Sequence, residues 1–150
     1  HDPISAGEIQ VLDQHFDKKL KTLFDALGIY PAKVLIGASG TFDTLSDIYC
    51  CQNFLPNGED DPETPLTLEA FYKIYEELIS KNRTQRMQIP GMIEMRVDMI
   101  VVACCLVRYI LSRHCFNNIR VSSYSLKEGV LASHIYGQTS NEASMHYRNL

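Results

Sequence analysis

The stretch Val34-Leu35-Ile36-Gly37-Ala38-Ser39-Gly40-Thr41 decides the fold. Its apolar start, which ends at a glycine, predicts a short strand buried on both faces. The glycines let the backbone turn tightly, and the spacing of the apolar residues from Phe42 onward predicts a helix. The sequence therefore predicts a strand, a glycine-rich turn and a helix in succession, as in an α/β protein.

The turn Gly37–Thr41 is the first candidate site. Free backbone N–H groups at the start of a helix form a donor-rich, electropositive end suited to phosphate oxygens, and the hydroxyls of Ser39 and Thr41 add donors. The turn lacks the lysine of a P-loop, the three-glycine spacing of a dinucleotide site and the G-x-S-x-G spacing of a hydrolase elbow. A packing role for the glycines stays open beside phosphate binding.

Two amphipathic helices are predicted on either side of this segment. Apolar residues at steps of three and four predict a first helix that begins at a capping box of Ser5 and Glu8 and ends at Gly28. A second helix with an apolar face begins at Thr67. Residues 52–66, rich in proline and acidic side chains, predict a solvated surface excursion.

A long helix is predicted over about residues 92–113. Its middle, residues 99–107, is apolar all round, which is typical of a helix buried on every side. Glu94, Arg96 and Asp98 lie at its start and are interpreted as a supporting charge cluster, with substrate contact as the alternative. A small basic patch consists of Lys81, Arg83 and Arg86. It is interpreted as solvent-facing, with contact to a phosphate chain as the alternative.

A second strand is predicted over Ile119–Ser122. A capping box of Ser125 and Glu128 then begins a last helix, in which Gly129 would allow close approach to a neighbouring element. The polar residues 137–150 predict a weakly ordered tail.

The two predicted strands are each followed by a helix, which implies a parallel pair with helical crossovers. Two strands without further sheet are marginal in water, and neither segment has the alternating pattern of an exposed edge. We therefore expect neighbouring strands to come from residues upstream of His1.

The composition argues against several classes of protein. Fourteen Lys and Arg against eighteen Asp and Glu give a net charge of −4, so no general basic field exists to bind nucleic acid or an anionic membrane. The five cysteines form two adjacent pairs plus Cys115, which indicates reduced thiols in a cytoplasmic protein rather than disulfides or a zinc site. No apolar run approaches the ~18 residues of a membrane span.

Metal ligands and a catalytic triad find little support. Each histidine is isolated, so no metalloprotease-type ligand pair exists. Ser39, His134 and an aspartate such as Asp43 or Asp98 could be combined into a hydrolase triad, but a chain of this length supplies such a trio by chance. A serine hydrolase is therefore a weak hypothesis.

Three segments, in their order and spacing, resemble the second domain of the Ppx/GppA family of exopolyphosphatases and guanosine pentaphosphate phosphatases. They are the glycine-rich turn after residues 34–36, the Pro-Gly and Arg-x-Asp segment of residues 89–102, and the Leu-x-Glu-Gly helix start within residues 121–131. With the first helix they cover residues 2 to about 136.

The resemblance implies an actin-like, sugar-kinase-like α/β fold, built from two ribonuclease-H-like domains around a phosphate-binding cleft. Residues 1–136 would be the C-terminal portion of the second domain, with few parallel strands, several helices and 137–150 as a tail. The antiparallel strands that begin this domain, its phosphate loop and the catalytic glutamate of the first domain would lie upstream.

The resemblance also implies a function. The full protein would hydrolyse phosphoanhydride bonds of inorganic polyphosphate or guanosine pentaphosphate, with Mg²⁺ as its cofactor. This segment would supply a wall of the cleft, would bind no metal and contain no catalytic residue, and would be inactive alone.

The resemblance assigns two groups of residues in this chain. Phosphate would be bound by four residues of the turn: Gly37, Ser39, Gly40 and Thr41. The family often has glycine where Ser39 stands. Structural support would come from the other matched segments: Arg96, Asp98, Ser125, Glu128 and Gly129.

A binding module without catalysis is the alternative function. Such a protein would keep the same scaffold and bind a nucleotide or alarmone, or another protein. In the main hypothesis the expected partners are the phosphate substrate, the upstream part of the same protein and a second copy in a homodimer, but no nucleic acid or membrane.

Overall fold

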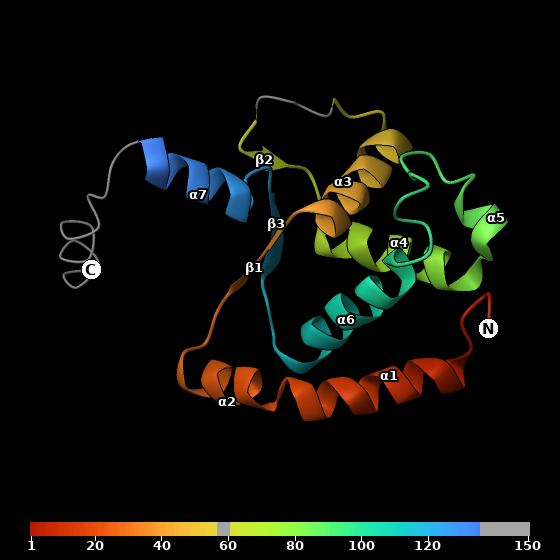
Figure 1. Cartoon of the computed structure of the whole chain (residues 1–150). Helices are drawn as coiled ribbons and strands as arrows, with labels where there is room; N and C mark the ends of the chain where they lie inside the picture. Colours follow the sequence, from red (N-terminus) through yellow and green to blue (C-terminus); the bar gives the residue numbers. More distant parts are fainter. Residues whose placement is uncertain (57–60, 136–150) are drawn as a thin grey trace.

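A computed structural model describes residues 1–56 and 61–135 (Figure 1). The predicted tail 137–150 lies outside the described residues. The elements follow in the order α1 Ala6–Lys19, α2 Lys21–Ile29, β1 Val34–Ala38, α3 Gly40–Asn53, β2 Glu63–Thr64, α4 Leu68–Ser80, α5 Arg83–Arg86, α6 Ile100–Arg113, β3 Asn118–Ser122 and α7 Leu126–Ile135.

The sheet has the strand order β1-β3-β2. β1 and β3 are parallel, with partners from Val34↔Asn118 to Ala38↔Ser122, so the predicted parallel pair is confirmed. β2 pairs antiparallel with β3 and was not predicted, because its two residues lie within the excursion 52–66. An ion pair between Glu63 and Arg120 joins these two strands.

Only one face of the sheet is covered by the described helices. Leu35 and Gly37 face the core beside Ile119 and Val121 of β3, of which Val121 is fully buried. On the other face Ile36 is 63% exposed. The prediction that this strand is buried on both faces is therefore wrong for the described residues, because their helices pack against one face of the sheet only.

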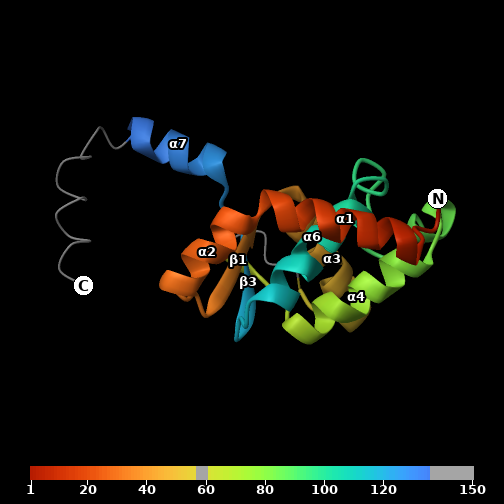
Figure 2. The same cartoon turned by 90° about the horizontal axis from the view of Figure 1, so that it is seen from below.

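The core lies between the covered face of the sheet and helices α3, α4 and α6, and α1 packs across α6 (Figures 1 and 2). α4 confirms the predicted amphipathic helix, with Thr67 as its N-cap. Its buried face includes Phe71, Ile74 and Leu78. Each buried side chain of this size contributes ~1.5–3 kcal/mol of hydrophobic stabilisation.

The predicted first helix is divided at Leu20. The capping box of Ser5 and Glu8 is present, but α1 ends at Lys19 and α2 runs through Gly28 to Ile29. Leu20 has φ −101° and its N–H still donates to the carbonyl of Phe16, so the chain bends without a loop. The bend brings the rings of Phe16 and Phe24 to 5.5 and 6.0 Å from the ring of Tyr109.

The predicted long helix over residues 92–113 is shorter than expected. α6 begins at Ile100, because residues 92–99 form turns after Gly91, whose φ is +89°. α6 is also not buried on every side, since Val102 is 47% exposed. Its buried face includes Cys104, where burial raises the pKa of the thiol to about 12. The five cysteines are all free thiols.

α7 projects from the body of the molecule (Figures 1 and 2). Its apolar side chains are exposed, among them Leu126 (84%) and Ile135 (65%). A Cβ at Gly129 would meet nothing within 4 Å, so the close approach predicted for this glycine is absent within residues 1–56 and 61–135. In the same part of the chain, no helix is long and apolar enough to span a membrane.

Candidate phosphate-binding site

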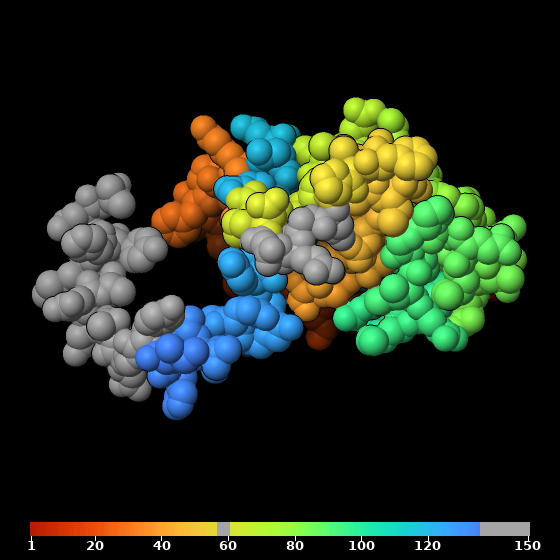
Figure 3. Space-filling view, turned by 90° about the horizontal axis from the view of Figure 1, so that it is seen from above, coloured from red at the N-terminus to blue at the C-terminus, as the bar shows by residue number. Residues whose placement is uncertain are grey.

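The turns after β1 and β3 lie at the same end of the sheet. Ala38 and Ser122 are register partners at the carboxyl ends of this parallel pair, and such ends are where ligands bind in open α/β sheets. An open groove of about 790 Å³ lies there, lined by Ser39 and by residues of the α7 segment. Figure 3 shows the first turn of α3 in orange between α7 in blue and the segment before α6 in green. The fold thus brings together all three segments on which the resemblance rests.

The first turn of α3 presents backbone donors. The N–H groups of Phe42 and Asp43 donate to the carbonyl of Ser39, at 2.9 and 3.2 Å. The N–H groups of Gly40 and Thr41 have no acceptor among the described residues. The positive end of the helix dipole adds to these donors, so the turn is suited to an anion.

Ser39 holds an unusual backbone conformation. Its φ of 69° and ψ of 176° fall in a region that is essentially restricted to glycine and costs ~1–3 kcal/mol for other residues. Its side chain makes no capping hydrogen bond to the helix. Glycine would adopt this conformation without strain, so Ser39 places backbone strain in the turn at the groove.

The two glycines of the turn have different roles. A Cβ at Gly37 would overlap the ring of Phe42, so this glycine lets Phe42 pack on β1. Gly37 is buried, whereas Ser39 is exposed. A Cβ at Gly40 would overlap the guanidinium of Arg96, which lies directly over the first residue of α3.

Arg96, predicted from the sequence to give structural support, lies against this turn. Its side chain is half-buried, and its Nε is buried without a hydrogen-bond partner among the described residues. A buried donor left unpaired costs ~1–3 kcal/mol, and a phosphate oxygen would relieve that cost. Arg96 therefore lies at the start of α3, against Gly40, with a donor that has no partner among the described residues. The Arg-x-Asp spacing marked this residue, but only the fold places it over the turn.

The other supporting residues form contacts of their own. Asp98 accepts a hydrogen bond of 3.1 Å from Arg83 rather than facing the turn. Glu128 accepts from the N–H and from the hydroxyl of Ser125, each at 2.7 Å. These two bonds lower the pKa of Glu128 to about 2 and fix the start of α7 beside the groove.

The hydrolase triad receives no support from the geometry. Ser39 and His134 both line the groove, but no side-chain hydrogen bond within the described part of the chain joins the Ser39 hydroxyl or the His134 ring to the other or to an aspartate carboxylate. Among residues 1–56 and 61–135, no three His, Cys, Asp or Glu side chains form a metal-binding group.

The profile of the Ppx/GppA phosphatase family matches residues 1–136. The chain belongs to this family. A search of curated proteins gave no match. The family assignment made from the three segments is therefore confirmed.

Solved structures of family members have the same fold. An exopolyphosphatase from Cytophaga hutchinsonii is 38% identical, with a TM-score of 0.86 over 91% of this chain and 44% of its own. The Ppx/GppA family member from Aquifex aeolicus is 21% identical, with a TM-score of 0.74 over 93% of this chain and 44% of its own, and it supports the fold alone. The partial actin-like α/β fold predicted from the sequence is thus confirmed. The chain spans less than half the length of either protein.

Proposed function

We propose that the chain is part of a phosphoanhydride hydrolase that releases phosphate from inorganic polyphosphate or guanosine pentaphosphate. The family is one of phosphatases, and the relative at 38% identity is an exopolyphosphatase. The observation that carries the proposal is the unpaired Nε of Arg96 against Gly40, at the start of the helix where the N–H groups of Gly40 and Thr41 are free among the described residues.

The proposed role of this segment is to bind and orient phosphate groups. In phosphoryl transfer the charge on the non-bridging oxygens must be stabilised, and fixed donors do this without reorganising during the reaction. The turn of Ser39, Gly40 and Thr41 with Arg96 supplies such donors. Gly37 shapes the turn by its contact with Phe42. A general base for the attacking water is assigned to no residue of this chain.

Mg²⁺ remains part of the proposal for the whole enzyme only. A magnesium site needs carboxylate or other oxygen ligands, and the described residues hold no cluster of three acidic or histidine side chains. The described residues therefore do not fit a metal site, and we assign no step of the reaction to a metal here.

An assay of phosphate release tests the proposal. The protein as the cell makes it is expected to release phosphate from polyphosphate, from guanosine pentaphosphate or from both, and more so with Mg²⁺. Binding of either compound without release would support the alternative of a nucleotide-binding or alarmone-binding module. Failure to bind either would refute both functions.

Arg96→Gln tests the observation behind the proposal. Hydrogen bonds to charged groups contribute ~1.5–3 kcal/mol, so the variant should bind a phosphate chain ~10–100-fold more weakly. Lys73→Gln is the matched control, because Lys73 is exposed on α4 and forms an ion pair with Glu69, its own neighbour on that helix. Equal affinities of the two variants would remove Arg96 from the site.

A further inference from the structure

Arg86 is a buried cation that the proposed function does not use. It lies on the short helix α5 and is 4% exposed, the lowest value for a charged residue in the described part of the chain. The basic pattern around it predicts a solvent-facing side chain, which is wrong. Burying a guanidinium requires that its donors be satisfied.

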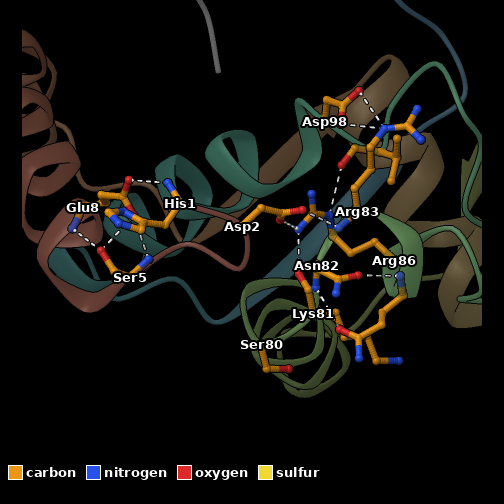
Figure 4. A network of polar contacts seen from close by, with 12 residues as sticks. His1, Asp2, Ser5, Glu8, Ser80, Lys81, Asn82, Arg83, Arg86 and Asp98 are labelled. Atoms are coloured by element: carbon orange, nitrogen blue, oxygen red, sulfur yellow. Dashed lines mark hydrogen bonds and ion pairs between the residues drawn. The ribbon is translucent and has the colours of Figure 1, made fainter.

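The donors of Arg86 reach three separate segments of the chain. Nη1 donates to Oδ1 of Asp2 at 2.7 Å and to the carbonyl of Lys81 at 2.6 Å. Nε donates to the carbonyl of Val97 at 3.1 Å. Figure 4 shows the side chain in the network that links the N-terminal segment, the end of α4 and α5.

The bond to Val97 fixes the residue that follows Arg96. Val97 is fully buried, so its carbonyl has no water to bond instead. On the outer side, Arg83 contacts Glu94 at 3.5 Å and Asp98 at 3.1 Å. Two arginines of α5 therefore hold the turn that carries Arg96, one from the inside and one from the surface.

The same segment is also fastened along α3. A Cβ at Gly91 would lie 2.6 Å from the backbone of Asp47 and Ile48, in the middle of that helix. Arg96 lies over Gly40, at its start. The chain from Gly91 to Arg96 thus runs along α3 toward its N-terminus. Arg86 bonds to the carbonyl of Val97, the residue directly after Arg96.

We propose that Arg86 is a positioning residue of the phosphate-binding site, which holds the guanidinium of Arg96 over Gly40 through its bond to the carbonyl of Val97. This inference rests on the proposed function. It adds a residue that touches no phosphate but sets the affinity of the site. We therefore expect the substitutions of Arg86 and Arg96 to be coupled in the free energy of phosphate binding. A residue that contributed only to stability would show no such coupling.

A double-mutant cycle tests the coupling. Tripolyphosphate binding is measured by calorimetry on the protein as the cell makes it and on R86Q, R96Q and the double variant, each first shown to be folded by thermal unfolding. We expect R86Q to weaken binding about tenfold when Arg96 is present and less than twofold when it is absent. R86K, which keeps the charge and one donor group, should recover part of the affinity.

Each outcome decides the inference. Additive losses, or unchanged affinity in R86Q, would overturn it while leaving the proposed function intact. Unfolding of both R86Q and R86K would also overturn it, because Arg86 would then act on stability alone. Absence of tripolyphosphate binding by the unsubstituted protein would refute the proposed function and the inference together. Weaker binding in R96Q with unchanged binding in R86Q would refute only the role of Arg86.

Discussion

At the scale of single residues, the strained backbone of Ser39 distinguishes this turn from its neighbours. Ser39 has a positive φ of 69°, while Gly37 and Gly40 on either side have none. The two glycines are required instead by what lies against them, the ring of Phe42 and the guanidinium of Arg96. The structure thus shows a packing role for both glycines, and this role is compatible with the binding role that we propose for the turn.

Ser39→Gly is expected to stabilise the protein. Relief of a backbone strain of ~1–3 kcal/mol exceeds the ~0.5–1 kcal/mol that glycine loses in conformational entropy. The free energy of unfolding should therefore rise by about 1 kcal/mol in urea denaturation. Ser39→Ala is the control, because it also lacks the hydroxyl but keeps the Cβ and its strain. A glycine variant no more stable than the alanine variant would contradict the strain.

At the scale of elements, local signals in the sequence predicted more than the apolar pattern did. The strand, turn and helix at residues 34–53 and the capping box of Ser5 and Glu8 follow from neighbouring residues, and the structure has them. At the start of α7 it has the bonds from Ser125 to the carboxylate of Glu128. The predicted start of α6 was wrong because contacts to α3 and α5 hold residues 92–99 in another conformation. The spacing of apolar residues in the sequence does not reveal such contacts. The burial of Arg86 was missed for the same reason, since its acceptors lie far apart in the chain.

The start of α7 should depend on pH through Glu128. Hydrogen bonds from Ser125 lower the pKa of this carboxyl from 4.5 to about 2. Because the pKa is lower in the folded state, the bonds stabilise the helix start above about pH 4.5 and are lost as the pH falls toward 2. Carbon chemical shifts of α7 should report this loss by NMR.

Two variants control this pH dependence. Glu128→Gln should abolish the change in the helix start over that range, and Ser125→Ala should move the titration of Glu128 toward its ordinary value. A Glu128 carboxyl that titrates at its ordinary pKa in the unsubstituted protein would contradict the capping geometry.

At the scale of the whole molecule, apolar side chains are exposed on β1 and on α7. Ile36 on the edge strand is 63% exposed, and Val130 and Leu131 on α7 are 61% and 58% exposed. A long uncovered edge strand and apolar patches favour association with other chains. The arrangement agrees with the expectation of further strands, and the fold of the longer relatives contains more than the described residues.

The 150-residue chain studied alone should therefore self-associate. Analytical ultracentrifugation is expected to show dimers or larger species whose fraction rises with concentration. Ile36→Lys places a charge on the open edge, which disfavours strand pairing, so this variant should be more monomeric. A monomeric, cooperatively melting chain without this substitution would contradict the prediction.

The most direct test of the account follows the backbone amides of the turn by NMR while tripolyphosphate is added. We predict saturable shifts that are largest at the N–H groups of Gly40 and Thr41 and that weaken strongly in Arg96→Gln. Shifts confined to other parts of the protein, or equal shifts with and without Arg96, would contradict the claim that this turn binds phosphate.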